Sequence, residues 1–278
     1  MKVSLIVAVY KDIEALSLIV KALEKQTYTD FELVVAEDNN SAEMKQYINS
    51  VKSINIQHTY QEDRGVRKSR SVNNAIIKST GEYLIFIDGD CIPYSTFIES
   101  HVVLAEKDAV LSGRRFNLGP LFSERIRVKK LTSYQLELSL FRNFSSLKKD
   151  VQEGHIEAGL YINPESIIYR KLIANKKNTS LLGCNYSCYR SDMQLINGLD
   201  ESYGASPVSD DTDIEWRFKK AGLSLKTCKF AANIFHLYHK RSNKVSRVFA
   251  IGSELDLMLK RKVHENFKAL IGLDNHKI

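Results

Sequence analysis

Cysteine is scarce in this chain. The four thiols, Cys91, Cys184, Cys188 and Cys228, are spread over 278 residues. A disulfide scaffold needs more cysteines in a shorter chain, so we exclude one and expect free, buried thiols. One alternative stays open, because Cys184 and Cys188 with His236 and His239 spell C-x3-C and H-x2-H, close to the spacing of structural zinc sites.

Long apolar runs are also missing. A transmembrane helix needs about 20 apolar residues, and the longest stretches here, Leu5 to Tyr10 and Tyr83 to Ile87, are far shorter. We therefore expect no membrane span. Residues 1–10 carry one lysine and no small-residue cleavage site, which indicates a first β-strand rather than a signal peptide and predicts a cytoplasmic protein.

Proline is rare, at 4 residues, and the sequence has no internal repeat and no low-complexity segment. No linker therefore separates independent domains, and the length suits one large domain or two small ones. A glycine-rich turn after the first strand and a P-loop are both missing, which argues against NAD enzymes and P-loop NTPases.

Positive charge is concentrated in two regions. The net charge is +7, with 13 basic against 6 acidic residues in 113–180 and 9 against 4 in 240–278. Basic surfaces attract phosphates of nucleotides, nucleic acids or anionic lipids. Solvated helix faces are an equally good interpretation of the same pattern.

Strand and helix patterns alternate through residues 1–112. Apolar strand patterns and helical periodicities follow one another in the order Val3–Val9, Ile13–Lys25, Phe31–Ala36, Ser41–Val51, Ile54–Tyr60, Arg67–Ser79 and Tyr83–Ile87. This order predicts an α/β fold with a mostly parallel central sheet and helices on both faces. Ligands of such sheets bind at the carboxyl ends of the strands.

The remaining sequence is more helical. Residues 113–178 have helical periodicity and 181–189 alternate like a strand. We predict a helix over 210–221, a strand over 225–238 and an amphipathic helical stretch over 245–270.

Asp88-Gly89-Asp90 directly follows the buried strand that ends at Ile87. Two carboxylates on one turn can hold Mg²⁺ or Mn²⁺, which in turn binds diphosphate oxygens. An ordinary turn is the alternative interpretation of this tripeptide.

Several segments together resemble one family. Residues 3–10, 32–38 and 81–90 are similar in order and spacing to the nucleotide-sugar half of GT-A glycosyltransferases of family 2. Residues 183–187, 197–201, 210–217 and 236–239 resemble the C-terminal motif of its galactosyltransferase-like and chondroitin-polymerase-like branch. The resemblance implies a GT-A fold with three parts: a nucleotide-sugar-binding half at 1–112, an acceptor-binding and catalytic half at 113–240 with a basic helical insertion at 113–180, and a basic helical extension at 241–278.

The resemblance also implies roles for individual residues. The donor nucleotide sugar would be contacted by Val9, Tyr10, Asp38, Arg67, Asp88 and Asn185. Asp38 would pair with a uracil ring, Arg67 would face the diphosphate, with Lys68 or Arg70 as further candidates, and Asn185 would lie near the donor sugar. The metal ligands would be Asp90, Asp88, His236 and His239, with the choice between the two histidines left open.

The catalytic base implied by the resemblance is Asp211, preceded by Asp210. The family motif reads Trp-Gly-Gly-Glu-Asp, whereas this chain has Ala205-Ser-Pro-Val-Ser-Asp-Asp211, so the surface on which the sugars stack differs. Acids at a helix start also cap it, and we expect Asp211 to do both and Asp213 to cap only.

The expected activity is inverting, metal-dependent transfer of a hexose from a UDP-sugar to a glycan or lipid-linked acceptor in bacterial surface polysaccharide synthesis. Gal or GalNAc is favoured and Glc or GlcNAc is an alternative; the cofactor is Mn²⁺ or Mg²⁺. Expected partners include an anionic inner membrane touched by the insertion and the tail, or a second copy of the chain, but no nucleic acid. Two other classes stay open, a sugar nucleotidyltransferase and a non-catalytic nucleic-acid- or glycan-binding protein.

Overall fold

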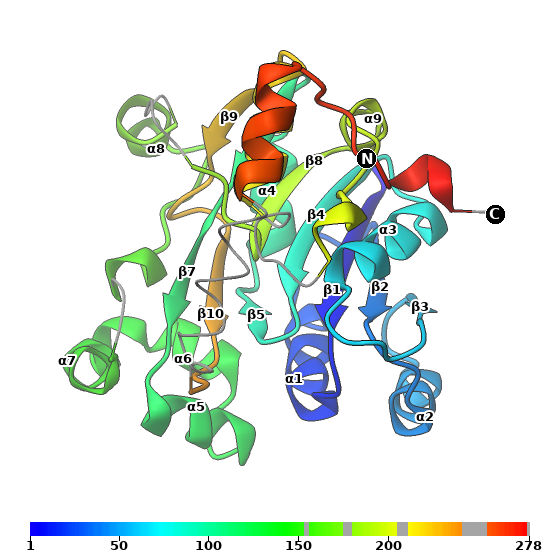
Figure 1. Ribbon diagram of the computed structural model, residues 1–278. Helices are drawn as coiled ribbons and strands as arrows, with labels where there is room; N and C mark the ends of the chain where they lie inside the picture. Colours follow the sequence, from blue (N-terminus) through cyan, green and yellow to red (C-terminus); the bar gives the residue numbers. More distant parts are fainter. Residues whose placement is uncertain (153–155, 175–179, 205–210, 241–254, 277–278) are drawn as a thin grey trace.

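The computed structural model describes residues 1–152, 156–174, 180–204, 211–240 and 255–276. A seven-stranded sheet lies at its centre, with strand order β3-β2-β1-β4-β8-β6-β9 (Figure 1). Its strands are β1 (Val3–Val9), β2 (Phe31–Glu37), β3 (Ile56–Thr59), β4 (Tyr83–Asp88), β6 (Ala109–Ser112), β8 (Asn185–Tyr189) and β9 (Ser224–Thr227).

The sheet is mostly parallel, as predicted. β1 pairs in parallel with both β2 and β4, and β2 with β3, whereas β8 runs antiparallel to β4 and β6. The register places Val9 beside Glu37 and Ala8 beside Asp88. The carboxyl ends of β1, β2 and β4 therefore meet at one edge, where ligands of parallel sheets bind.

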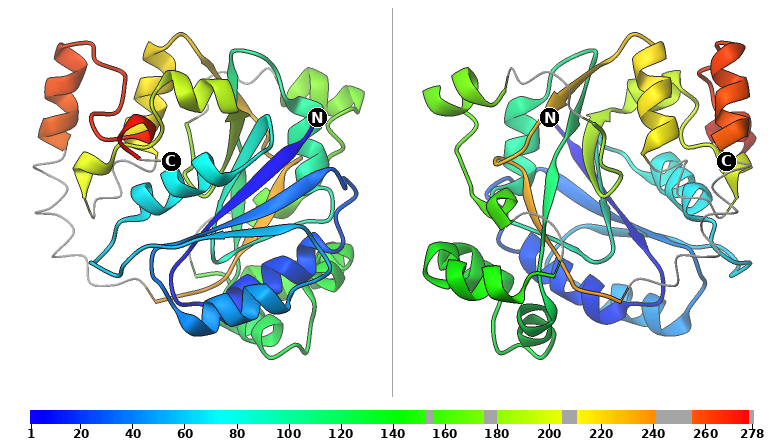
Figure 2. Two further views of the ribbon diagram at one scale, coloured as in Figure 1. Left: turned by 90° about the vertical axis from the view of Figure 1, so that its right-hand side faces the viewer. Right: turned by 60° about the vertical axis from the view of Figure 1, so that its left-hand side comes forward.

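Helices cover both faces of this sheet, and Figure 2 shows the two layers. One face packs against α1 (Ile13–Leu23), α2 (Ala42–Ser50) and α4 (Phe97–Leu104), and the other against α3 (Lys68–Lys78), α9 (Arg190–Leu195) and α10 (Thr212–Lys220). Side chains alternate between the faces of a strand, so β1 sends Leu5 and Val7 to the first layer and Ile6 to the second. Burial on both faces explains why these strands are continuous apolar runs.

A second sheet of three strands changes two predictions. It consists of β5 (Cys91–Pro93), β10 (Asn233–His236) and β7 (Arg114–Asn117), in that order. The single strand expected over 225–238 is two strands, because a turn in which the amides of Ala231 and Ala232 both donate to the Cys228 carbonyl moves the chain from one sheet to the other. Residues 114–117, expected to be helical, pair in parallel with β10.

The helical insertion and the C-terminal region complete the chain. Residues 113–180 contain α5 (Pro120–Arg127), α6 (Ser133–Leu138), α7 (Leu140–Asp150), α8 (Ile167–Leu172) and a 3-10 turn at Ile156–Gly159. Two further 3-10 turns lie at Glu201–Tyr203 and Leu273–Asn275. Of the helical stretch predicted over 245–270, residues 255–263 are helical and residues 264–270 are not, while the part before residue 255 lies outside the described residues. Within the described ranges, no helix combines the length and the apolar character that crossing a bilayer requires.

A buried polar network joins α4 to the central sheet. His101 is 0% exposed, and its Nδ1 lies 2.7 Å from the hydroxyl of Ser187 while its Nε2 lies 3.2 Å from the Asn185 amide oxygen. The Tyr83 hydroxyl lies 2.8 Å from the same serine oxygen. Burial lowers the pKa of His101 to about 3, only partly opposed by the contact with Asn185, so the imidazole is neutral in the folded protein.

We predict that His101 makes the protein sensitive to acid. Because the unfolded imidazole binds a proton near pH 6.5 and the folded one does not, stability falls as the pH drops through that value. Between about pH 7 and about pH 5, the wild type should lose about 2 kcal/mol more unfolding free energy than His101→Gln. Urea denaturation at both pH values measures this difference; equal losses in the two proteins would contradict the account.

Candidate functional site

A cleft of about 620 Å³ opens at the carboxyl edge of β1, β2 and β4. Its walls come from the ends of these strands, from the loop before α3 and the start of α3, from α5 and from the segment after β10. The lining residues are Ala8, Val9, Tyr10, Asp12, Asp38, Gly65, Val66, Lys68, Ser71, Asp88, Gly89, Asp90, Arg127, Leu237 and His239. Val9, Tyr10, Asp38, Asp88 and Asp90 were all predicted as site residues, and the cleft brings them together.

Asp38 lies where β2 ends and is almost buried, with 6% exposed. Its Oδ1 accepts a hydrogen bond from the Gln61 amide at 2.6 Å, and its Oδ2 accepts one from the backbone amide of Arg67 at 2.7 Å. Its own amide donates to the Val9 carbonyl at 2.9 Å. The carboxylate is therefore held rigidly, and since a carboxylate has about four acceptor positions it can still accept a further donor.

The turn after β4 passes very close to β1. A Cβ atom on Gly89 would lie 2.8 Å from the carbonyl oxygen of Ala8, so only glycine fits between the two acids without moving the backbone. Asp88 turns toward α3, where its Oδ1 lies 2.6 Å from the Lys68 ammonium. The two acids of the turn therefore have different partners.

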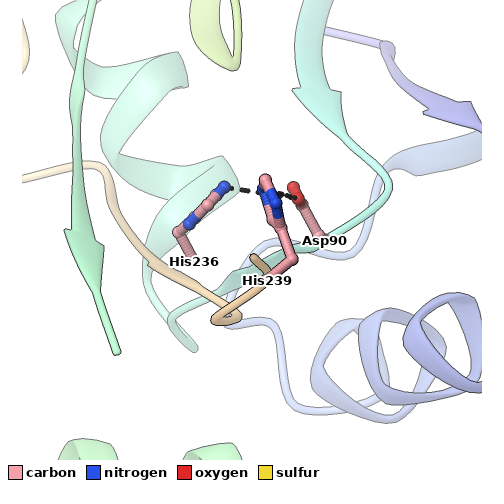
Figure 3. A group of neighbouring side chains, drawn as sticks. All are labelled: Asp90, His236 and His239. Atoms are coloured by element: carbon pink, nitrogen blue, oxygen red, sulfur yellow. Dashed lines mark ion pairs between the residues drawn. The ribbon is translucent and has the colours of Figure 1, made fainter. Parts of the chain in front are cut away.

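Asp90 meets two histidines instead. His236, at the end of β10, and His239, just after it, place their Nε2 atoms 3.3 and 3.4 Å from Asp90 Oδ2 (Figure 3). β10 is held there because it pairs with β5, with His236 opposite Cys91, and because the amide of Leu237 donates to the Asp90 carbonyl at 2.9 Å. The metal-ligand atoms of Asp90, His236 and His239 all lie within 4.8 Å of one another.

The ionisation of Asp90 suits a metal ligand. Burial raises the pKa of Asp90, but its hydrogen bond with His236 and its electrostatic interaction with His236 and His239 outweigh burial and lower the pKa to about 2. The carboxylate is thus ionised at neutral pH. One carboxylate oxygen and two imidazole nitrogens that converge on one point fit a divalent metal ion.

The zinc hypothesis is wrong. All four cysteines are free and buried, as expected, but among the described residues the histidines converge on Asp90 and no cysteine joins them. Asp88 likewise is not a member of this cluster, because its carboxylate contacts Lys68.

Two basic side chains that line the cleft were not clearly identified from the sequence. Lys68 was only a secondary candidate beside Arg67, and Arg127, from the insertion, was not considered. Arg127 is held by Asp12 at 3.0 Å. The side chain of Arg67 turns away to the Glu62 carbonyl, and Arg70 pairs with Glu201 at 3.4 Å. Nothing local in the sequence links residue 127 to the first strand, so only the fold reveals it.

The structure does not place Asn185 near a donor sugar, as the resemblance had implied. It is 0% exposed, and its amide donates to the carbonyls of Arg114 and Ala232, both at 2.9 Å. Its oxygen faces His101. With every polar atom engaged inside the protein, Asn185 holds the two sheets together and does not reach a donor sugar.

Asp211 lies outside the cleft, at a second groove of about 360 Å³. Its Oδ1 accepts the Thr212 amide at 2.8 Å, so its expected capping of α10 is confirmed. Asp210 lies outside the described residues. Asp213 was expected only to cap the helix, but it is fully buried and paired with Arg217 at 2.6 Å.

Comparison with known sequences identifies a family. The sequence model described as "Glycosyl transferase family 2" matches residues 4–173. An uncharacterized glycosyltransferase of Rickettsia bellii (strain RML369-C) is 28% identical over 108 residues, which are 38% of this chain and 15% of that protein.

Solved structures share the fold at low identity. Staphylococcus aureus TarS has a TM-score of 0.59 at 12% identity, over 99% of this chain and 41% of TarS; a structure of its residues 1–349 contains UDP-GlcNAc. The mannosyltransferase PcManGT from Pyrobaculum calidifontis, in complex with GDP-Man and Mn²⁺, has a TM-score of 0.59 at 14% identity, over 95% of this chain and 64% of that chain. The chain thus has the GT-A fold but spans only part of several of these proteins.

Proposed function

The chain belongs to glycosyl transferase family 2, and we propose that its cleft binds a UDP-sugar from which it transfers a hexose to an acceptor hydroxyl. Membership of this family favours sugar transfer over the two other classes, a sugar nucleotidyltransferase and a non-catalytic binding protein. One observation carries the choice of site. The lining of the cleft at the carboxyl edge of the sheet includes Asp38 together with Asp90 and His239 of the Asp90–His236–His239 cluster.

The cleft suits both ends of a nucleotide diphosphate. Asp38 is a fixed acceptor for the imide N–H of uracil, beside the exposed ring of Tyr10, of which 54% is accessible. The cations of Lys68 and Arg127 line the same cleft and would attract the diphosphate. TarS and PcManGT bind UDP-GlcNAc and GDP-Man in their own structures, which supports a sugar-nucleotide donor.

Asp90, His236 and His239 would hold the metal ion. Two imidazoles among three ligands favour Mn²⁺ over Mg²⁺, because Mg²⁺ is bound almost only through oxygen. When bound, the ion supplies Lewis-acid neutralisation of the charge on the leaving diphosphate. The residues themselves fix its place, since Asp90 is ionised and both histidines come from or follow β10.

Asp211 is our candidate for the general base, with Asp210 beside it in sequence. In a single displacement, the acceptor oxygen bonds to the anomeric carbon while the bond from that carbon to the diphosphate oxygen breaks and UDP leaves. Asp211 takes the proton of the acceptor hydroxyl. Attack from the face opposite UDP inverts the configuration and needs no covalent intermediate.

The sugar and the acceptor follow from the sequence resemblance. We propose Gal or GalNAc as the transferred hexose, with Glc or GlcNAc next, and a glycan or lipid-linked acceptor of a bacterial surface polysaccharide. The candidate sugars differ in the configuration of one hydroxyl, which a protein distinguishes by very few hydrogen bonds. A panel of UDP-sugars is therefore the appropriate test.

We predict that one UDP-sugar releases UDP slowly in the presence of Mn²⁺ and not with EDTA. Asp90→Asn should abolish the metal-dependent release, and Asp211→Asn should slow it by about 10²-fold, the usual contribution of a general base. Asp108→Asn is the matched control, an exposed acid at a positive φ of 59° that asparagine tolerates. Release that is indifferent to EDTA, or full activity of Asp90→Asn, would contradict the proposed site.

The insertion is our candidate for contact with an anionic membrane. Leu138 and Phe141 are 71% and 82% exposed where α6 meets α7, and Arg142, Lys148 and Lys149 lie on the same short helix as Phe141. Apolar side chains beside basic ones suit the headgroup region of anionic lipid. This contact would bring the enzyme to a lipid-linked acceptor.

Phe141→Ser should lower co-sedimentation with phosphatidylglycerol vesicles by about tenfold, the effect of losing one partly inserted aromatic side chain. Val103→Ser, an exposed apolar residue of α4, should have no effect. Binding that does not depend on anionic lipid would contradict the proposed membrane contact. A dimer interface in the C-terminal region is the alternative, and light scattering of the full chain tests it.

A further inference from the structure

A buried network fixes the first turn of α10. Asp213 and Arg217 are both 0% exposed and lie 2.6 Å apart, and the Tyr203 hydroxyl donates to Asp213 at 2.7 Å. Tyr203 itself is 2% exposed. The helix that begins after Asp211 is therefore tied to the segment before it.

The same network reaches the C-terminal helical residues 255–263. Arg261, only 6% exposed, donates to the Tyr203 hydroxyl at 3.2 Å and forms an ion pair with the buried Asp200. Asp200 also accepts the Leu270 amide at 2.8 Å. Losing Arg261 would leave a buried carboxylate unpaired, so this contact holds the C-terminal helical residues beside α10, as both views of Figure 2 show.

A groove of about 360 Å³ lies between α10 and the C-terminal helical residues. One side is a face of α10, another is the start of the segment before β8, and the C-terminal helical residues contribute Lys262. The lining residues are Ser180, Leu181, Asp211, Thr212, Glu215, Trp216, Lys219 and Lys262. Glu215 Oε2 accepts the Leu181 amide at 2.8 Å, so two walls of the groove are joined directly.

The lining chemistry matches a sugar ring. Trp216 is the single tryptophan of the chain, and the Lys262 ammonium lies 5.9 Å from the centre of its ring. A pyranose has an apolar C–H face that packs on an aromatic ring, and hydroxyls at its edge that bond to ammonium and carboxylate groups. Besides the indole, the groove is lined by two carboxylates and two ammonium groups, which are equal in number and opposite in charge. A polar, uncharged ligand therefore fits this groove better than a phosphate does.

We propose that this groove is a saccharide-binding subsite in which Trp216 stacks on a pyranose ring and Lys262 bonds to its hydroxyls. The C-terminal helical residues form one wall of this subsite, held there by Arg261. The groove and the cleft share no described lining residue, so its sugar is not the one joined to the nucleotide. Because Asp211 lies in its wall, we assign the sugar to the acceptor, and this assignment alone rests on the proposed function.

The single tryptophan makes the test direct, because all indole emission reports on this groove. We titrate the protein with methyl β-D-galactopyranoside, methyl β-D-glucopyranoside and methyl β-D-glucuronide, and follow the Trp216 fluorescence. At least one neutral glycoside should produce a saturable change. Lys262→Met should weaken that binding by about fivefold, the effect of one lost hydrogen bond, whereas Lys260→Met, an exposed lysine of the same helical residues, should not.

UDP with Mn²⁺ is the control ligand and should leave the fluorescence unchanged. No saturable response to any glycoside, or equal responses in Lys262→Met and the wild type, would overturn the subsite even if UDP release proceeds normally. A response to the glucuronide alone would overturn the assignment of a neutral sugar. A response to neutral glycosides in a protein that releases no UDP would support the subsite while the proposed transferase site fails.

Discussion

The pairing of β10 with β5 is the constraint on which the candidate site depends. Asp90 follows β4 and His236 ends β10, far later in the chain, yet the register that places His236 opposite Cys91 brings them within 3.3 Å. The amide of Leu237 bonds to the Asp90 backbone and fixes this register next to the cluster itself. A slip of one residue would turn His236 to the other face of its strand and disperse the ligands.

The central sheet supplies the other half of the site. Parallel strands β1, β2 and β4 end at one edge, and each contributes an acid or a backbone group there. These acids are held by specific partners: Asp38 by Gln61 and a backbone amide, Asp88 by Lys68, Asp90 by two histidines. The result is a rigid cleft with both signs of charge, and such preorganised polar groups are what a nucleotide diphosphate requires.

The sequence predicted the first half of the fold well because its signals are local. The strands at Val3–Val9 and Tyr83–Asp88 are buried on both faces, and the helices between them have clear periodicity. Motif order also placed Asp38 and Asp90 at the right strand ends. The failures concern side-chain partners that only tertiary structure decides: Asn185 faces inward to His101, and Asp213 pairs with Arg217 inside the core. Arg127 was missed because α5 reaches the cleft through packing, not through any motif.

The most direct test of the central claim is a crystal structure with UDP and Mn²⁺, measured at the manganese absorption edge. The account predicts that the anomalous peak marks a manganese ion coordinated by Asp90 and by His236, His239 or both. The diphosphate of UDP should lie beside this ion and the uracil ring beside Asp38. The same map would show which histidines bind the ion. Bound UDP elsewhere on the protein, or manganese bound away from Asp90, would contradict the account.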